Sequence, residues 1–502
     1  MKRRWLVPLV AAGLIAGTTA ARADDSVVRT GFGAVRGETN GHTRVFEGIP
    51  YAAPPERWRD PTPPRKWDGV RDATKPGPAC AQLPGELPDG STAEDCLYLN
   101  VTTPAKGKNK PVVVWVHGGG FFMGAGSNYD ARRFAERGDV VVVTVNYRLG
   151  IFGFFGMPGL AGSGTFGLED QQAALKWVRN NIAAFGGDPR NVTLAGQSAG
   201  AMSVCAQLTS PAAAGLFDRA VMQSGSCRSG WLDNFEYRGE VAATIFQPVR
   251  ALEEHGTEIA RDLGCGDVEC LRGKKPEELM PQHLAFIQPA YGTPVLPEYP
   301  GDAIERGRFH RVPVLSGTTK NEATPWVAAY DDKAPMRPET FEAVLKETFK
   351  GRAEEVKAVY SPEKYGSAAL AWAALVTDRM WSCTQYETAR GLAAKTNVFE
   401  YEFADPNPPK LSPIPPQMPL GAQHASDLWD FFDLGRAPKF TEAQQRLSDR
   451  MIHDWAQFTR TGISGWPRFT GKRDYVQSFA PDEIRPVDLA AEHHCDFWKE
   501  RE

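Results

Sequence analysis

The pentapeptide Gly196-Gln197-Ser198-Ala199-Gly200 has the residue types and spacing that nucleophilic chemistry at a serine requires. It matches the pattern G-x-S-x-G, in which a sharp turn between a strand and a helix pushes the serine hydroxyl into the open. The pattern alone arises by chance about 0.2–0.3 times in a chain this rich in glycine. Here VTLA before it predicts a strand and AMSVCAQL after it predicts a helix, so we expect Ser198 to be a nucleophile.

A second glycine-rich segment, HGGGF at 117–121, directly follows the predicted strand VVVWV. Glycines let backbone N–H groups converge on one oxygen, which stabilises the oxyanion that forms in acyl transfer. We expect the donors to be the N–H groups of Gly119, Gly120 and Ala199. The other interpretations are a flexible glycine-rich loop and a phosphate-binding loop, but the Lys-Ser/Thr pair that ends a phosphate-binding loop is missing.

A serine nucleophile also needs a base, and in sites of this kind the histidine follows the serine and the acid along the chain. Four late histidines qualify. His453 lies in the helical pattern SDRMIHDWAQF, and His493 and His494 come after the last predicted strand. His424 follows the predicted strand TNVFEYEF by a long loop, from which an imidazole could reach the turn. Chain order therefore favours His424.

The acid should lie between Ser198 and His424, where spacing alone selects no carboxylate. Glu322 is favoured because it follows the predicted strand VPVLSGTT by only a few residues, at the end of the sheet toward which the turn points. Asp302 and Asp378 remain alternatives.

Strand and helix patterns alternate after Lys110, which predicts an α/β fold with a mostly parallel central sheet flanked by helices. PVVVWVHG and DVVVVTVNYR are nearly continuous apolar runs, typical of strands that are buried on both faces. Two mainly helical inserts, at 230–290 and 325–395, should cover the carboxyl ends of the strands, where ligands bind. We expect the proline-rich stretch 405–419 to be an extended loop inside one domain, residues 24–502.

The segment 1–23 combines a basic start, the apolar run LVPLVAAGLIAG and an Ala-Arg-Ala end. This pattern is typical of a signal peptide. The apolar run is too short for a transmembrane span, which needs about 20 apolar residues. An uncleaved N-terminal anchor is the alternative, and no later segment is long and apolar enough to cross a membrane. We expect a secreted chain that is more acidic after cleavage than the whole sequence, whose net charge is −4. Such a surface gives no electrostatic reason to expect nucleic acid or an anionic membrane as a partner.

The eight cysteines fit an oxidising compartment, and their spacing matches no zinc site, so we expect disulfides and no metal. The close pairs Cys80 with Cys96 and Cys265 with Cys270 are typical of staples over short loops. Free buried thiols are the alternative interpretation.

Segments along nearly the whole chain resemble the type-B carboxylesterase family, which includes cholinesterases and bile-salt-activated lipases. The matching segments are FEGIPYAAPP, EDCLYLNV, WVHGGGF, VNYRLGIFGF, WVRNNIAAFGGDPRNVTLAGQSAG, GTTKNEA and GAQHASDLWDFF. The resemblance implies an α/β-hydrolase fold and hydrolysis of small-molecule carboxylic esters, with no cofactor. It implies Ser198 as nucleophile, Glu322 as acid and His424 as base. It also implies an oxyanion hole made of Gly119, Gly120 and Ala199.

The resemblance further implies three disulfides, Cys80–Cys96, Cys265–Cys270 and Cys383–Cys495. It leaves Cys205 and Cys227 as candidates for a fourth.

The chain departs from the family pattern in three places. The first disulfide loop, AQLPGELPDGSTAED, has no aromatic residue, so a choline-binding cation–π site is not expected there. Asp427 stands where the family usually has Glu, and Gln197 stands where Glu is commonest. At these two positions the contacts around the three catalytic residues should differ from those typical of the family, whereas the three catalytic residues themselves match the pattern.

Two other functions stay open. A lipase or sterol-ester hydrolase would use the same residues on long acyl chains. A non-catalytic adhesion or binding protein of the family would have lost one of the three catalytic residues, and here all three positions are filled.

Overall fold

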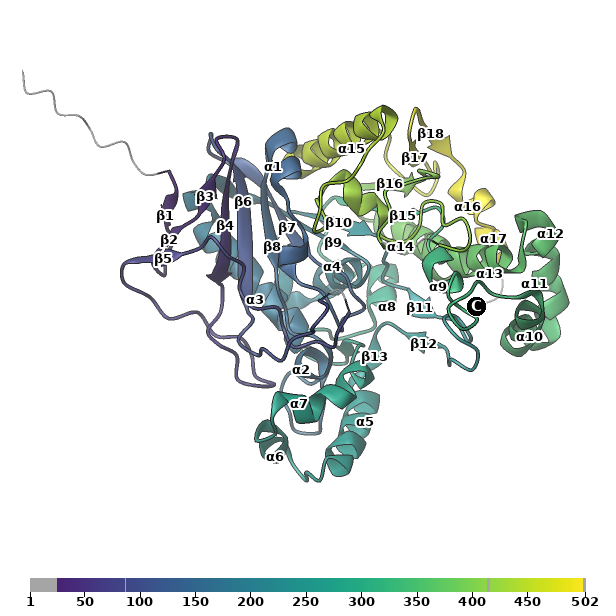
Figure 1. Ribbon diagram of the computed structural model, residues 1–502, viewed down its shortest axis with the longest axis horizontal. Helices are drawn as coiled ribbons and strands as arrows, with labels where there is room; N and C mark the ends of the chain where they lie inside the picture. Colours follow the sequence, from purple (N-terminus) through teal and green to yellow (C-terminus); the bar gives the residue numbers. More distant parts are fainter. Residues whose placement is uncertain (1–24, 86, 413–415, 500–502) are drawn as a thin grey trace, which may run out of the picture.

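The computed structural model describes residues 25–85, 87–412 and 416–499 (Figure 1). The signal peptide predicted for 1–23, and residues 413–415 of the predicted extended loop, lie outside the described residues.

An 11-stranded sheet forms the centre of the fold. The strands from β8 to β17 in spatial order are parallel, and antiparallel strands complete both edges. The sheet is therefore mostly parallel, as predicted. Its strands, in spatial order, are β18 (Glu483–Val487), β17 (Val476–Ala480), β16 (Val398–Phe403), β15 (Val314–Thr319), β10 (Arg219–Gln223), β9 (Gly187–Gln197), β7 (Lys110–Val116), β8 (Val141–Val145), β6 (Tyr98–Pro104), β4 (Thr43–Pro50) and β3 (Glu38–Thr39).

Both faces of the central strands are buried, which explains their continuous apolar sequences. In β7, Val112 and Val114 belong to one hydrophobic layer, whereas Val113 and Trp115 belong to the other. Successive side chains of a strand point to opposite faces, so an alternating pattern would have left one face polar. A separate three-stranded sheet near the N-terminus contains β1 (Val27–Arg29), β2 (Ala34–Arg36) and β5 (Val70–Asp72).

Helices cover the two faces of the sheet. The layer with Val113 and Trp115 includes Phe134 from α1 (Arg132–Gly138) and Met451 from α15 (Glu442–Thr461). The opposite layer includes residues of α3 (Phe166–Asn181), α4 (Ala199–Thr209) and α14 (Cys383–Ala393), among other helices. Among the described residues, no helix is long and apolar enough to cross a membrane.

The two predicted inserts differ in structure. The first is mixed rather than mainly helical, because the two-residue strands β11 (Gly230–Trp231), β12 (Ala243–Thr244) and β13 (Gln247–Pro248) precede its helices. Its helices are α5 (Val249–Asp262), α6 (Val268–Arg272), α7 (Pro276–Leu279) and the 3-10 helix η4 (Met280–Ala285), and the three labelled ones lie at the bottom of Figure 1. The second insert is helical, as predicted, and most of it lies at the right of the figure. It contains α9 (Thr324–Val327), α10 (Pro338–Phe349), α11 (Ala353–Val359), α12 (Pro362–Tyr365), α13 (Ala368–Val376) and the π-helical turn η6 (Thr377–Ser382).

Four disulfides cross-link the chain. The structure forms the three pairs that the family resemblance implies, together with a fourth between Cys205 and Cys227. Cys383–Cys495 closes the longest loop and ties the short helix α17 (Cys495–Lys499) to α14.

A buried charge cluster holds the same C-terminal segment. His493 is 4% exposed, and its Nδ1 lies 2.5 Å from Asp378 Oδ1 while its Nε2 lies 2.7 Å from Glu402 Oε1. Burial alone would lower the pKa of His493, but the two carboxylates outweigh burial and raise the pKa to about 10. A charged imidazole therefore joins η6, β16 and the C-terminal segment at neutral pH.

We predict that His493→Gln lowers the free energy of unfolding at pH 6.5 and that the difference from wild type narrows between pH 6.5 and 10. The folded pKa is above the ordinary value of 6.5, so the stabilisation is complete below 6.5 and is lost as the pH rises through 10. Urea unfolding across this range measures the difference, with the exposed His453→Gln as control. A difference that stays constant from pH 6.5 to 10 contradicts the assignment.

Candidate active site

The predicted strand–turn–helix at Ser198 is formed by the end of β9 and the start of α4. Ser198 has φ 56° and ψ −126°, a strained backbone conformation of the kind found at functional sites. The turn is too tight for side chains at Gly196 and Gly200. A Cβ at Gly196 would come within 2.5 Å of the Gly200 backbone, and one at Gly200 would overlap the carbonyl oxygen of Val116. Gln197 and Ala199 are buried while Ser198 is partly exposed, so the turn presents the serine to the solvent side.

His424 lies between a buried carboxylate and this turn. Its Nδ1 lies 2.5 Å from Glu322 Oε2, and Glu322 is fully buried. The other oxygen of Glu322 accepts the backbone N–H of Thr319 at 2.7 Å, which fixes the carboxylate. With Nδ1–H donating to Glu322, Nε2 carries the lone pair that can accept a proton or a hydrogen bond. This is the tautomer that a general base requires.

The Nε2 atom of His424 points at the turn. It lies 3.1 Å from the side-chain amide of Gln197, the residue directly before Ser198. At position 197 the sequence departs from the family pattern that it resembles, in which glutamate is commonest. A neutral amide can donate to Nε2 without adding a negative charge beside the imidazole.

The HGGGF loop lies against Ser198. A Cβ at Gly118 would be 3.1 Å from Ser198 Cβ. Gly119 and Gly120 have φ values of 101° and 60°, which glycine adopts without steric cost. Within the described part of the chain, no group accepts their N–H hydrogens. Ala199 begins α4, and the first N–H groups of a helix have no acceptor inside the helix.

Two aromatic rings of the second insert pack beside the imidazole, and one ring of the first insert packs against them. The ring centroids of Trp326 and Trp381 lie 5.1 and 5.8 Å from that of His424, and the two indoles stack on each other at 5.3 Å. Phe235 closes the group with edge contacts to both indoles. We call Phe235, Trp326 and Trp381 the aromatic wall. By contrast Trp372, another aromatic of the second insert, is fully buried core.

The other candidates lie in different surroundings. His453 is exposed on α15 and contacts Asp454, and His493 belongs to the charge cluster described above. His494 Nε2 contacts the Tyr365 hydroxyl. Asp302 forms a surface ion pair with Arg306.

Asp427 is linked to the turn through hydrogen bonds with Gln223. It is fully buried, and its Oδ2 accepts hydrogen bonds from Gln223 Nε2 at 2.8 Å and from the Tyr401 hydroxyl at 3.1 Å. The backbone oxygen of Gln223 accepts the N–H of Ser198 at 2.9 Å. Burial raises the pKa of Asp427 to about 6, and the charge of Glu322 acts in the same direction. Sequence reasoning missed Gln223, which carries no motif signal.

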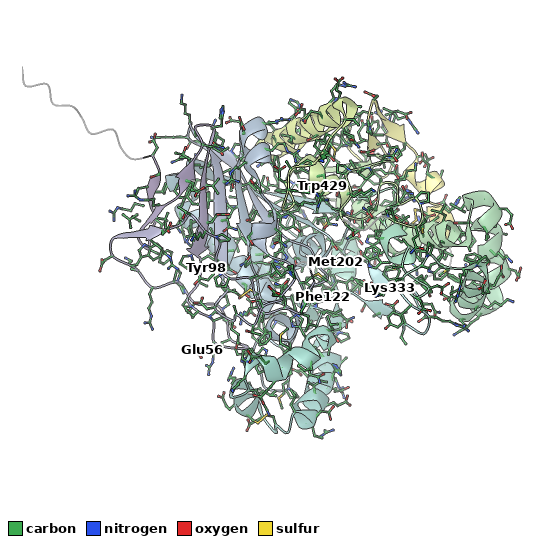
Figure 2. The ribbon with its side chains drawn as sticks, viewed as in Figure 1. Glu56, Tyr98, Phe122, Met202, Lys333 and Trp429 are labelled. Carbon is green, nitrogen blue, oxygen red and sulfur yellow. A yellow bond between two sulfur atoms is a disulfide. The ribbon has the colours of Figure 1, made fainter. Side chains whose placement is uncertain are left out.

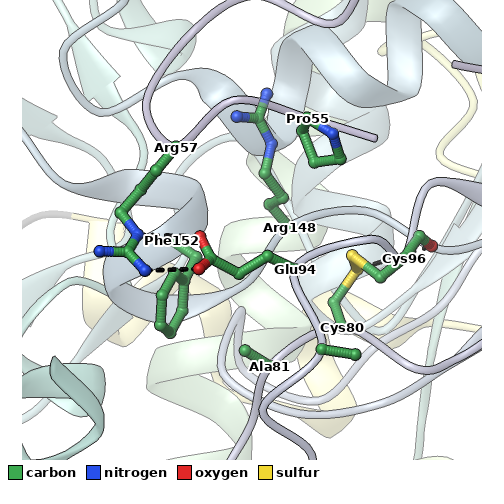
Figure 3. A pocket seen from close by; sticks show the side chains of 9 residues that line it. Pro55, Arg57, Cys80, Ala81, Glu94, Cys96, Arg148 and Phe152 are labelled. Atoms are coloured by element: carbon green, nitrogen blue, oxygen red, sulfur yellow. Dashed lines mark hydrogen bonds and ion pairs between the residues drawn. A yellow bond between two sulfur atoms is a disulfide. The ribbon is translucent and has the colours of Figure 1, made fainter. Parts of the chain in front are cut away.

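A small cavity lies beside the Cys80–Cys96 disulfide, where Arg57 is paired with Glu94 (Figure 3). It has room for about one water molecule, which is too little for a substrate. Figure 2 labels Phe122, the residue after the HGGGF loop, and Met202 of α4, and both labels lie where the sheet meets the inserts. Among the described residues, no group of three or more His, Cys, Asp or Glu residues could hold a metal ion.

Comparisons with known proteins match this geometry. The profile of the Carboxylesterase family matches residues 24–498. The chain is 37% identical to the para-nitrobenzyl esterase of Bacillus subtilis (strain 168) over 476 residues, which cover 88% of this chain and 92% of that protein. It is 33% identical to the cocaine esterase of Homo sapiens over 507 residues, with 92% of this chain and 87% of that protein covered.

The acetylcholinesterase of Bungarus fasciatus is 32% identical over 560 residues, which cover 98% of this chain and 89% of that protein. The solved structure of a thermophilic PNB esterase superposes with a TM-score of 0.75 at 32% identity, over 94% of this chain and 99% of the other. The chain has the α/β-hydrolase fold, and it belongs to the carboxylesterase family of carboxylic ester hydrolases.

Proposed function

We propose that the chain hydrolyses carboxylic esters in two steps through an acyl-enzyme on Ser198. The observation that carries the proposal is the position of His424, which joins the buried carboxylate of Glu322 to the turn that presents Ser198. The same three residues were selected from the sequence by order along the chain and by family resemblance.

In the first step, Ser198 Oγ attacks the ester carbonyl while His424 Nε2 takes its proton. Glu322 holds the imidazole in the required tautomer and stabilises the imidazolium. The N–H groups of Gly119, Gly120 and Ala199 donate to the oxyanion of the tetrahedral intermediate. His424 then returns the proton to the alcohol oxygen as it leaves. Water hydrolyses the acyl-enzyme by the same sequence of proton transfers.

We propose that residues 24–502 act as one catalytic domain and that the chain is exported through the segment 1–23. Eight cysteines paired in four disulfides support an oxidising compartment. The proposed substrate is a small-molecule ester rather than a nucleic acid. The aromatic wall favours an apolar acyl group of limited length over the long chains of the lipase alternative. The chain's similarity to named esterases argues against the non-catalytic alternative.

Ser198→Ala should lower kcat for p-nitrophenyl butyrate by about six orders of magnitude, because the nucleophile is lost while the fold remains. A fluorophosphonate probe should label the wild type once and leave the variant unlabelled. Wild-type turnover in the variant would reject Ser198 as nucleophile.

Glu322→Gln should lower kcat about 10³–10⁴-fold, because the amide no longer fixes the imidazole tautomer or stabilises its charge. Steady-state kinetics with the same ester measures the loss. Asp302→Asn is the matched control, since Asp302, an alternative acid, lies in a surface ion pair. Equal losses in the two variants would be incompatible with Glu322 as the acid.

Trp326→Leu should raise the kcat/KM ratio of p-nitrophenyl octanoate to acetate, because a smaller side chain opens the aromatic wall. Trp326 is partly exposed, so it can be shortened at less cost to the core than the buried Trp381. Trp67→Leu, in the N-terminal region, is the control for a general effect of losing a tryptophan. An unchanged octanoate-to-acetate ratio would show that the wall does not limit the acyl group.

A further inference from the structure

The HGGGF loop and Phe122, which follows it, are held at their carbonyl oxygens by two residues outside the proposed catalytic group. The backbone N–H of Gly150 donates to the carbonyl oxygen of Phe121 at 2.8 Å. Nε2 of His283 lies 2.8 Å from the carbonyl oxygen of Phe122, 161 residues away in the sequence. A carbonyl oxygen can only accept, so His283 is the donor.

The surroundings of His283 fix its ring. It belongs to η4 at the end of the first insert and is fully buried. The ring packs directly on Gly150, where any Cβ would overlap the imidazole, and its centroid lies 6.3 Å from that of Phe152. Nδ1 is buried and, within the described residues, has no hydrogen-bond partner. Burial lowers the pKa of His283, so the ring is neutral and carries its proton on Nε2.

The loop needs such an anchor because its backbone is unusual. Gly119, Gly120 and Phe121 are consecutive residues with positive φ, and Phe121 is not a glycine. Such a conformation persists only where the surrounding structure imposes it. The N–H groups of Phe122 and Met123 both donate to the carbonyl of Gly119 at 3.0 Å. A hydrogen bond that fixes Phe122 therefore also restrains the peptide between Gly119 and Gly120, whose N–H group is an expected oxyanion donor.

We propose that His283 is a positioning residue of the oxyanion hole. By donating to the Phe122 carbonyl, it fixes the turn that aims the N–H groups of Gly119 and Gly120. The first insert thus contributes to transition-state stabilisation without supplying a reacting atom. This proposal rests on the acyl-enzyme mechanism proposed above.

The test compares His283→Gln with His283→Asn. Gln can place an amide N–H where Nε2 lies, whereas Asn is one methylene shorter and leaves the Phe122 carbonyl without its donor. We expect His283→Asn to lower kcat for p-nitrophenyl butyrate by about 10–100-fold with little change in KM, because small misplacement of catalytic groups costs this much. His283→Gln should recover most of the loss. The inhibition constant of a trifluoromethyl ketone, whose adduct carries an oxyanion, should rise in parallel with the fall in kcat/KM.

His310→Asn is the matched control, because His310 Nε2 donates to the Ser210 carbonyl at 2.7 Å, a bond of the same kind at the far end of α4. It should leave kcat and the inhibition constant unchanged. Rates are referred to active sites titrated with a fluorophosphonate, so that unfolded chains are not counted. Equal kcat values in the Gln and Asn variants, or an equal loss in His310→Asn, would overturn the proposal. Such an outcome would overturn only the role of His283. If Ser198→Ala is inactive in the same experiments, the proposed acyl-enzyme mechanism still stands.

A measurement on the wild type is independent of any substitution. ¹⁵N NMR of the imidazole should show the neutral tautomer of His283 with its proton on Nε2. A proton on Nδ1 alone would leave Nε2 unable to donate and would also overturn the proposal.

Discussion

Close steric contact between the ends of the neighbouring strands β7 and β9 fixes the position of Ser198 relative to the glycine-rich loop. The turn after β9 touches the end of β7 so closely that Gly200 has no room for a Cβ beside the carbonyl of Val116. The loop that follows β7 carries Gly119 and Gly120, so this contact sets the expected oxyanion donors beside Ser198. Glu322 and His424 follow β15 and β16, which lie on the other side of β10. Four segments far apart in the sequence therefore meet because parallel strands end at one edge.

Burial and charge explain how the same edge would work as a catalyst. Glu322 is excluded from solvent, so its charge acts on His424 with little screening. The indoles of Trp326 and Trp381 pack against the imidazole, while Gln197 donates a neutral hydrogen bond to Nε2. The side chain of Gln223 donates a hydrogen bond to Asp427, and its backbone oxygen accepts the N–H of Ser198. These two bonds link Asp427 to the backbone of the turn. The inserts thus contribute aromatic side chains to the site.

Much of this arrangement follows from sequence patterns. Continuous valine runs predict doubly buried strands, and glycines on both sides of Ser198 predict the turn. The choice of Glu322 over Asp302 and Asp378 could not come from spacing, because it depends on which loops return to the same edge. His493 showed no sign of its partners, since Asp378 and Glu402 lie far away in the sequence. His283 was missed for the same reason, as a lone histidine in an insert gives no periodic signal. The first insert was expected to be mainly helical, but very short strands have too few residues for a pattern.

The central claim is that the acyl group of the substrate passes through Ser198. Mixing the chain with a p-nitrophenyl ester, quenching in acid within one turnover and mapping peptides by mass spectrometry tests it directly. The account predicts one acyl group per chain on the peptide that contains Ser198. Turnover with the acyl group on another residue, or with no acylated peptide under conditions in which deacylation limits the rate, would contradict it.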